Sequence, residues 1–311
     1  MSLERALELA ELAHGRGYPK PTVGAAVVAD GEIVGEGATE AGGRHGEIVA
    51  LAAAGEQARG ATLYVTMEPC AHHGTTPPCT DAIARAGIGR VVAGSRDPNA
   101  EAAGGLERLR DAGVEAELDD RFEARRQNEA WRAWVARGRP FVTYKAAVTL
   151  DGRVTVPGSR WVSGEQSRRQ VHELRAAADA VAVGMGTVRL ENPALDARDV
   201  DAARQPRRLA FGHGPLPRGS ELELRSGALE DELRALAADG VQSLLLEGGP
   251  TLAGAFLRAG LVDKLLLYVA PVLAGAGPGI LDQLVEPLEL TRLTSRPSGE
   301  DALLEAYLHE P

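Results

Sequence analysis

The sequence predicts an α/β protein with two domains, and three observations lead to this prediction. The chain has 311 residues, which is long enough for two domains of ordinary size. Short strand-like apolar runs alternate with helix-like runs along its length, which is the pattern of α/β folds. A polar stretch, 119–137, is followed by Gly138-Arg139-Pro140. We place the domain boundary there, so the domains span residues 1–140 and 141–311.

The first domain is expected to begin with a helix over residues 2–14, which Gly15 and Gly17 end. Strands at 23–29 and 33–37 flank Asp30-Gly31, a dipeptide typical of tight hairpins. The rest of this domain alternates between the two element types: helix 47–58, strand 62–66, helix 78–86, strand 90–93, helix 101–112, strand 114–118 and a polar helix 119–137.

The second domain repeats the alternation without any internal sequence repeat. Strands are expected at 141–148, 179–184, 207–211, 242–247, 263–270 and 302–308, and helices at 165–178, 229–239 and 250–259. This order favours a largely parallel sheet with helices on both faces.

Composition excludes several classes of protein. The apolar fraction of 44% and the charged fraction of 25% are those of a globular protein. No run approaches the roughly 18 apolar residues of a membrane helix, and the first residues lack the pattern of a signal peptide. We therefore expect a cytoplasmic protein that does not bind membranes, with its two cysteines reduced. A net charge of −10 and an aromatic content of 4% argue against a nucleic-acid partner.

The strongest chemical signal is a split group of residues in the first domain. It consists of His45-Gly46-Glu47, Pro69-Cys70 and Cys79. An imidazole and two thiols suit tetrahedral zinc, and three protein ligands leave one position open for catalysis. His-x-Glu followed by Pro-Cys and a second Cys is typical of zinc deaminases, in which the Glu moves protons. We predict His45, Cys70 and Cys79 as ligands and Glu47 as the catalytic acid/base.

Two other interpretations of this group remain open. His72 or His73 would complete a closed structural zinc site, which would leave Glu47 without a role. Alternatively, the histidine and the cysteines are unrelated core or surface residues. The expected elements place His45, Glu47 and Cys79 at the starts of helices, where the helix dipole favours thiolates.

The second domain gives weaker chemical signals. Gly184-Met185-Gly186-Thr187 and Glu247-Gly248-Gly249-Pro250-Thr251 each follow an expected strand, where a turn can present N–H groups to a phosphate. Most glycine pairs after strands are only turns. Lys145 and Asp151 are equally compatible with a structural ion pair or with a site.

The spacing of the cysteines in residues 65–79 is that of a known family. This segment resembles the deaminase domain of the bifunctional RibD family of riboflavin biosynthesis, as do Val23-Gly24, residues 30–37 and residues 96–99. The resemblance implies a cytidine-deaminase-like, three-layer α/β domain. It also implies hydrolytic, zinc-dependent deamination of 2,5-diamino-6-ribosylamino-pyrimidinone 5′-phosphate, with Glu47 relaying protons.

Several positions depart from the family pattern in this domain. Lys20 precedes Pro21 where the family has Asn, Ala71 replaces a Ser, and Thr75 replaces a basic residue. The usual Pro-His-Ala-Glu is Arg44-His45-Gly46-Glu47. None of these changes removes a zinc ligand or Glu47. We expect Lys20 or Arg44 to supply the positive charge near the substrate phosphate.

The second domain resembles the RibD reductase domain, through residues 145–153, 161–163, 174–175, 186–188, 191–195, 247–254 and 269–271. This resemblance implies a dihydrofolate-reductase-like α/β fold and NADPH-dependent reduction of the ribosyl group to ribityl. By motif match the cofactor contacts are Ala147, Trp161, Thr187, Glu191, Gly249, Pro250, Thr251 and Leu252. The substrate contacts are Ser159, Arg175, Leu195, Arg198 and Glu247.

Departures in this domain leave alternatives open. Glu191 replaces an Asp, Asp196 replaces a Thr, and Gly212-His213 replaces Asp-Ser or Asp-Thr. We interpret His213 as a solvated loop residue. One alternative is an active deaminase whose reductase domain has lost turnover; others are a nucleobase or nucleic-acid deaminase with an added module, and a zinc-stabilised scaffold. We also expect a homo-oligomer, with a strand such as 265–270 at the interface.

Overall fold

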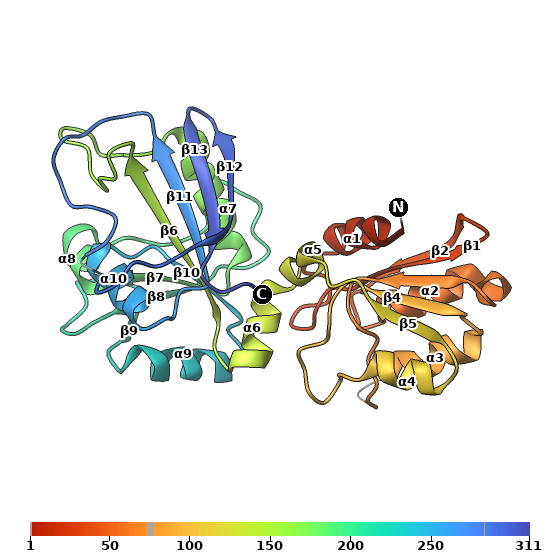
Figure 1. Cartoon of the computed structure of the whole chain (residues 1–311). Helices are drawn as coiled ribbons and strands as arrows, with labels where there is room; N and C mark the ends of the chain where they lie inside the picture. Colours follow the sequence, from red (N-terminus) through yellow and green to blue (C-terminus); the bar gives the residue numbers. More distant parts are fainter. Residues whose placement is uncertain (1, 74–76, 283) are drawn as a thin grey trace. The chain divides into compact units, whose positions relative to one another are not determined.

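A computed structural model describes the chain except for residues 1, 74–76 and 283. It divides into two compact units, the first ending at Arg137 and the second spanning Gly138–Glu310 (Figure 1). Each unit has its own β-sheet and its own hydrophobic core. The prediction of two α/β domains is confirmed. None of the described helices combines the length and apolar character needed to cross a membrane.

The sheet of the first unit has the order β2-β1-β3-β4-β5. Its strands are β1 (Gly24–Ala29), β2 (Glu32–Ala38), β3 (Thr62–Val65), β4 (Arg90–Ala93) and β5 (Glu115–Leu118). β1 runs antiparallel to β2 and β3, whereas β3, β4 and β5 are parallel. The loops after β3 and β4 therefore leave the sheet at the same edge.

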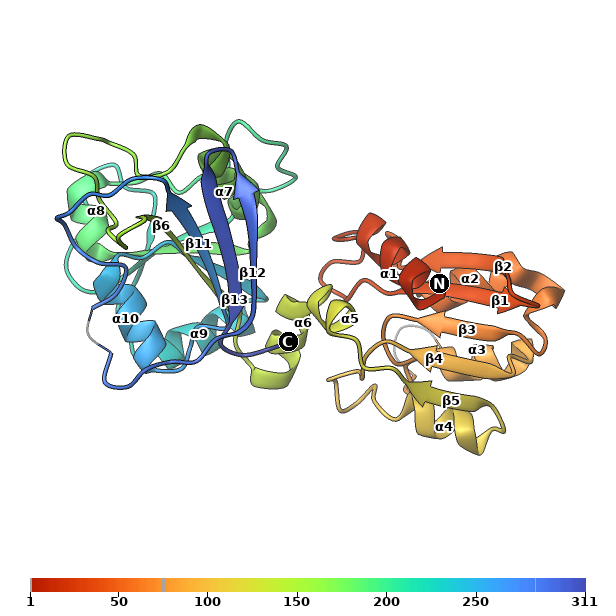
Figure 2. The same ribbon diagram turned by 45° about the horizontal axis from the view of Figure 1, so that its top comes forward.

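Helices cover both faces of this sheet (Figure 2). The helices of this unit are α1 (Ser2–Leu12), α2 (Gly46–Ala54), the 3₁₀ helix η1 (Gly55–Ala58), α3 (Cys79–Ala86), α4 (Gly105–Asp111), α5 (Phe122–Arg126) and α6 (Glu129–Arg137). Side chains of α2, α3 and α4 share one core with Ala25 and Val27 of β1. Gly24 faces α1 so closely that a Cβ there would lie 2.0 Å from the Ala6 carbonyl oxygen. The domain thus has three layers, as expected.

The second unit is built on an eight-stranded sheet with the order β12-β13-β11-β6-β10-β7-β8-β9. Its strands are β6 (Phe141–Thr149), β7 (Ala180–Gly184), β8 (Arg207–Phe211), β9 (Glu223–Arg225), β10 (Ser243–Leu246), β11 (Lys264–Ala270), β12 (Thr291–Ser298) and β13 (Asp301–Tyr307). Only the pairs of β13 with β11 and β12 are antiparallel in this sheet. The sheet is largely parallel, as predicted.

The connections of β7 and β10 position the second site. The helices are α7 (Glu165–Ala177), α8 (Met185–Glu191), α9 (Leu229–Ala238) and α10 (Pro250–Arg258). α9 and α10 pack on one face of the sheet, whereas α7 and α8 pack on the other. β10 lies directly beside β7, yet the two strands lead into helices on opposite faces. Parallel sheets bind ligands beyond the carboxyl ends of strands at such a switch point.

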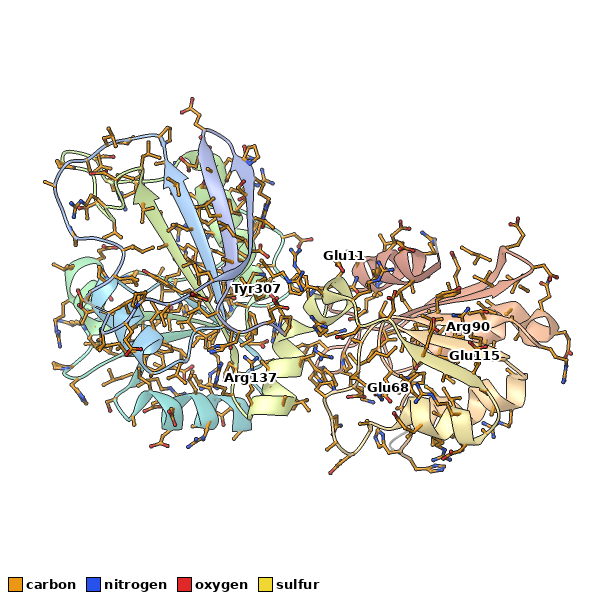
Figure 3. All side chains as sticks on the ribbon, viewed as in Figure 1. Glu11, Glu68, Arg90, Glu115, Arg137 and Tyr307 are labelled. Atoms are coloured by element: carbon orange, nitrogen blue, oxygen red, sulfur yellow. The ribbon has the colours of Figure 1, made fainter. Side chains whose placement is uncertain are left out.

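Charged side chains pair across neighbouring strands in both sheets, and Figure 3 labels one such pair, Arg90 and Glu115. Arg90 of β4 contacts Glu115 of β5 at 3.4 Å. In the second sheet, Lys264 of β11 lies 3.2 Å from Glu305 of β13, and its ammonium lies 5.1 Å from the ring centre of buried Tyr307. Cross-strand pairs of this kind stabilise a particular register.

Some predicted elements differ from the structure. The prediction of a single helix over 119–137 is wrong. The chain forms two helices there, α5 and α6, and between them the side chain of Asn128 hydrogen-bonds the backbone of Thr22. The turn expected at 184–187 is instead the start of α8, whose short length and Gly186 weaken the helical signal.

Two strands were not predicted. β9 and β12 are exposed edge strands with charged residues and no apolar alternation. β11, which was expected at an interface, is paired on both sides by β13 and β6. It therefore has no free edge, so a contact with a second chain through this strand would use a face of the sheet, and its place at an interface stays a prediction.

Candidate functional site

Three potential metal ligands of the first unit meet at one edge of its sheet. His45 caps the N-terminus of α2, Cys79 is the first residue of α3, and Cys70 follows β3. The Nδ1 atom of His45 lies 3.1 Å from Sγ of Cys79 and 3.8 Å from Sγ of Cys70. The ligand atoms all lie within 4.8 Å of one another, which fits a single metal ion. The predicted placement of His45, Glu47 and Cys79 at helix starts is confirmed.

The pKa values of the two cysteine thiols are shifted in opposite directions. The backbone N–H of Cys79, in the first turn of α3, donates to Sγ of Cys70 at 3.3 Å. Hydrogen bonds from the Cys79 thiol, from His45 and from this N–H lower the pKa of Cys70 to about 4, although burial opposes this. The pKa of Cys79 is raised, because its thiol donates to Cys70 and is buried. A thiolate is therefore available for metal binding near neutral pH.

Glu47 lies in the first turn of α2 and is almost completely buried. Burial raises the pKa of its carboxyl, and the charge on His45 partly offsets this rise. Its Oε2 atom is buried without a hydrogen-bond partner. A buried oxygen without a partner is costly, so a polar group is needed opposite it. The donor set and this oxygen fit a zinc ion with an open coordination position.

The closed, four-ligand interpretation has no support among the described residues. Neither His72 nor His73 belongs to the cluster of potential ligands in that part of the chain. Nδ1 of His72 is buried without a partner. His72 lines the neighbouring cavity instead.

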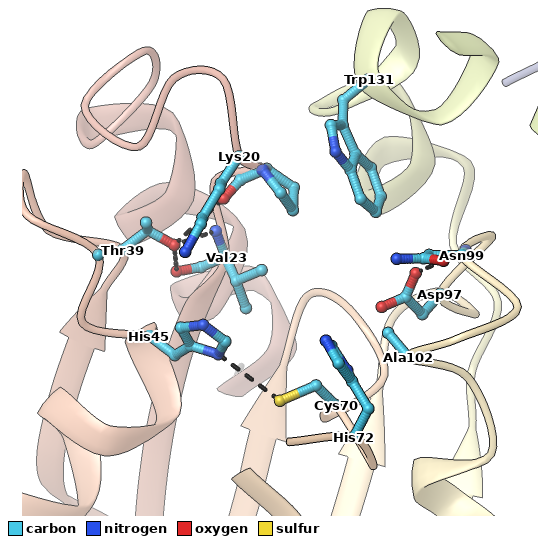
Figure 4. A pocket seen from close by; sticks show the side chains of 12 residues that line it. Lys20, Val23, Thr39, His45, Cys70, His72, Asp97, Asn99, Ala102 and Trp131 are labelled. Atoms are coloured by element: carbon cyan, nitrogen blue, oxygen red, sulfur yellow. Dashed lines mark hydrogen bonds between the residues drawn. The ribbon is translucent and has the colours of Figure 1, made fainter. Parts of the chain in front are cut away.

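A cavity opens beside His45 and Cys70 (Figure 4). Lys20, Val23 and Thr39 lie on one side, and Asp97, Asn99 and Ala102 lie on the other. The described residues that line it all belong to the first unit: Lys20, Pro21, Val23, Thr39, Gly43, His45, Cys70, His72, Asp97, Asn99, Ala102 and Trp131.

The buried carboxylate of Glu68 holds the Asp97 wall in place. Its two oxygens accept hydrogen bonds from the backbone N–H of Leu106 at 3.1 Å and of Asp97 at 3.3 Å. Gly105, at the start of α4, packs so tightly that a Cβ would lie 1.7 Å from the Pro69 carbonyl oxygen. The Pro69-Cys70 turn and the Asp97 wall are therefore fixed to each other.

Asp97 is a second unusual acid in the cavity. Burial raises the pKa of Asp97 to about 6, although the backbone N–H of Asn99 donates to its carboxylate at 2.8 Å. A carboxyl that titrates near neutral pH in a cavity is typical of a functional site.

The residues that depart from the family pattern differ in whether they face the cavity. Lys20 lines the cavity, whereas Arg44 is exposed and pairs with Glu40 at 2.6 Å. Lys20 is thus the better of the two candidates for a contact with phosphate. Ala71 is half-buried and its carbonyl accepts from Arg108. Thr75 lies outside the described residues.

In the second unit, Glu247 forms the centre of a charged cluster. It follows β10, and its side chain is 8% exposed. Arg175 of α7 contacts its carboxylate through two hydrogen bonds of 2.6 and 3.0 Å, and Lys145 of β6 lies 2.9 Å from Oε2. Burial opposes ionisation, but these two cations outweigh it and lower the pKa of Glu247 to about 2.

The alternative ion pair between Lys145 and Asp151 is wrong. Lys145 pairs with Glu247. Asp151 accepts from Thr149 and from the backbone N–H groups of Ala274 and Gly275. His213 is exposed in a loop, as interpreted from the sequence.

The two glycine-rich segments lie together beyond β7 and β10. A Cβ on Gly249 would lie 3.8 Å from Oγ1 of Thr187, and a Cβ on Gly184 would lie 3.4 Å from Leu252. Gly249 caps α10, Pro250 and exposed Thr251 begin it, and no side chain caps its first N–H groups. An uncapped helix start at a switch point fits the pyrophosphate of a dinucleotide.

The other predicted contacts of this unit are more dispersed. Ser159 and Trp161 share an exposed loop. The guanidinium groups of Arg160, in this loop, and of Arg168, in α7, lie 4.9 and 5.1 Å from the centre of the Trp161 ring. Ala147 is half-buried on β6, and Glu191 is exposed at the end of α8.

Leu195 and Arg198 lie on either side of Asp196 in the chain, and Asp196 contacts Arg175. The Leu195 side chain is buried in the core, with a left-handed backbone φ of 54°. Arg198 is exposed and pairs with Asp196 at 2.6 Å, and the Asp196 carbonyl accepts from Arg175. The structure therefore brings Arg175, Glu247 and Lys145 together, whereas Leu195 contributes its side chain to packing.

Sequence reasoning missed several residues of these sites. Trp131 and Thr39 carry no motif of their own, because their roles come from contacts distant in sequence. Glu68, Asp97 and Asn99 belong to segments that carried the family resemblance, and local patterns of this kind could have nominated them.

Comparisons with known proteins agree with this geometry. Residues 1–95 match the cytidine and deoxycytidylate deaminase zinc-binding region, and residues 140–304 match the RibD C-terminal domain. These matches confirm the predicted cytidine-deaminase-like and reductase-type folds.

Relatives match almost the whole chain. RibD of Mycobacterium tuberculosis is 44% identical over 88% of this chain and 85% of its own length. RibD of Aquifex aeolicus is 38% identical over 97% of this chain and 96% of its own. The solved structure of Acinetobacter baumannii RibD has a TM-score of 0.85 at 32% identity, and it covers 98% of this chain and 97% of that one.

A further solved structure is described by two activities. It is the diaminohydroxyphosphoribosylaminopyrimidine deaminase/5-amino-6-(5-phosphoribosylamino)uracil reductase of Thermotoga maritima. Its TM-score is 0.82 at 33% identity, with 98% of this chain and 97% of that chain covered.

The metal cluster predicts distinct effects of two substitutions. Cys79→Ser should reduce bound zinc from about one ion per chain to less than about a tenth of that, because a thiolate ligand is lost. His72→Ala, the matched control, should keep its zinc. Elemental analysis of the dialysed proteins measures both, and loss of zinc from the His72 variant would instead support a four-ligand site.

The Glu247 cluster predicts a pH-dependent contribution to stability. Because the folded pKa is lowered to about 2, ionised Glu247 stabilises the fold fully above its ordinary pKa, and this is lost as pH falls through 2. Glu247→Gln should destabilise by about 3 kcal/mol at pH 7, because two buried cations lose their partner. By pH 3 the difference from wild type should shrink by about half. Urea unfolding at both pH values measures this, and a difference independent of pH would contradict it.

Proposed function

Because this chain belongs to the RibD family of bifunctional deaminase/reductases of riboflavin biosynthesis, we propose that it catalyses two consecutive reactions. Residues 1–140 would remove the ring amine of 2,5-diamino-6-ribosylamino-pyrimidinone 5′-phosphate. Residues 141–311 would then reduce the ribosyl group of the product to ribityl with NADPH. The observation that carries the first assignment is the cluster of His45, Cys70 and Cys79 beside buried Glu47.

The deaminase step would use zinc held by His45 Nδ1 and the two thiolates. Zinc in such an open site activates water for attack on an electrophilic carbon. Glu47 would take up a proton at Oε2, the atom without a partner, and deliver it to the leaving amine. Its burial excludes bulk water from this transfer. Release of ammonia completes the reaction.

The substrate would be held by groups on both walls of the cavity. Asp97 and Asn99 can accept and donate hydrogen bonds to the ring or the ribose, and Lys20 can pair with the phosphate. The departures from the family at Lys20 and Ala71 leave the metal ligands and Glu47 unchanged.

In the reductase domain, the chain's own residues would mainly position the reactants. NADPH supplies the hydride for C1′ of the open imine form of the sugar. The uncapped start of α10 and the nearby Thr187 fit the cofactor phosphates. Ionised Glu247, fixed by Lys145 and Arg175, would accept hydrogen bonds from the substrate, and Arg198 would attract its phosphate.

The remaining proposals concern partners and location. The net charge of −10 favours a small-molecule substrate and no nucleic-acid partner. We propose a homo-oligomer in the cytoplasm, where the two thiols stay reduced and available to metal.

Substitution of Glu47 should separate the two activities. Glu47→Gln should lower ammonia release by about 10²- to 10⁴-fold, because the proton carrier is lost. Zinc content, and NADPH oxidation with the deaminated intermediate, should match wild type. Ammonia release and absorbance at the NADPH band measure the two reactions separately. Unchanged deamination would favour a zinc-stabilised scaffold without a catalytic role for Glu47.

A further inference from the structure

Trp131 of α6 carries the only large aromatic ring among the described residues that line the cavity. Its indole faces across the cavity, at the end away from His45 and Cys70, with Lys20 on the opposite wall (Figure 4). α6 lies beyond residues 1–95, which match the zinc-binding region, so that match assigns it no role.

Two neighbours of Trp131 in the chain attach this segment to residues beside each wall of the cavity. Asn128 is buried and clamps Thr22, accepting from its N–H and donating to its carbonyl, both at 2.8 Å. Arg132 donates to the Arg96 carbonyl at 2.7 Å. Thr22 adjoins the wall that contains Lys20, and Arg96 adjoins Asp97.

The local backbone places the side chains of Asn128, Trp131 and Arg132 on one side of the segment. The N–H of Arg132 donates to the Asn128 carbonyl at 2.9 Å, which is a helical hydrogen bond. Residues separated by three and four positions lie on one helical face. Trp131 is therefore presented to the cavity by a segment anchored on each side of it.

The position of Trp131 indicates which part of a substrate it would meet. The reacting carbon of the ring must lie at the metal ligands, so the ribosyl phosphate extends toward the other end of the cavity. An indole offers a flat apolar face for the C–H groups of a sugar, together with one N–H donor. Lys20, across the cavity, offers a positive charge for the phosphate.

We propose that Trp131 is a specificity-determining residue that binds the ribosyl phosphate end of the deaminase substrate, not its ring. This inference rests on the proposed deaminase function. It predicts that loss of the indole weakens binding of the phosphorylated substrate and leaves recognition of the free ring unchanged.

The test uses the full-length zinc-loaded protein and two ligands. One is the diaminopyrimidinone ribosyl phosphate as substrate; the other is the corresponding triaminopyrimidinone, which lacks the ribosyl phosphate, as competitive inhibitor. Trp131→Ala and Trp131→Leu should each raise KM for the substrate about tenfold with little change in kcat. The inhibition constant of the free ring should stay within about twofold of wild type.

Further variants separate this role from a structural one. Trp131→Phe keeps a ring and should restore most of the affinity. Trp134→Phe, on the same helix but outside the cavity lining, is the matched control and should behave as wild type. Zinc content, melting temperature and reduction of the deaminated intermediate should be unchanged in the Leu variant, which retains apolar volume.

Two results would overturn the inference. One is a KM within about twofold of wild type in both the Ala and the Leu variants; the other is an equal loss of affinity for the free ring. If the wild-type protein released no ammonia at all, the proposed function would fail instead, independently of Trp131.

Discussion

Three side chains distant in sequence meet because two helices begin where β3 ends. His45 caps α2, Cys79 opens α3, and Cys70 lies in the turn between the strand and α3. The side chain of neither N-cap residue hydrogen-bonds its own helix, and the backbone N–H of Cys79 donates to Sγ of Cys70 instead. The helix ends thus stabilise the anionic thiolate that a metal needs. Substrate cavity, buried Glu47 and supporting Glu68 are all arranged around this edge.

In the second unit, too, charged side chains gather where a strand ends and a helix begins, but the order of the strands differs. β10 enters the sheet between β6 and β7, so its end, with Glu247, lies beside the first turn of α8. A buried carboxylate is costly unless it is paired, and Lys145 and Arg175 supply the pairing from a strand and from a helix. The cluster therefore links β6, α7 and the end of β10.

The sequence was sufficient wherever the chemistry was local. The spacing of His45, Cys70 and Cys79 predicted the metal cluster, and strongly periodic segments such as α7 and β11 were placed within a residue or two. It was insufficient where long-range contacts decide the structure. β12 is an exposed edge with no apolar pattern, Asn128 interrupts a polar helix to bind Thr22, and Trp131 reaches the cavity only through tertiary packing.

The most direct measurement follows ammonia and NADPH together in one reaction of purified wild-type protein, zinc and the diaminopyrimidinone ribosyl phosphate. A bifunctional enzyme releases ammonia first and then oxidises one NADPH for each ammonia released. Ammonia release without any oxidation of NADPH, even when the deaminated intermediate is supplied, would contradict the account and leave a deaminase with an inactive reductase domain.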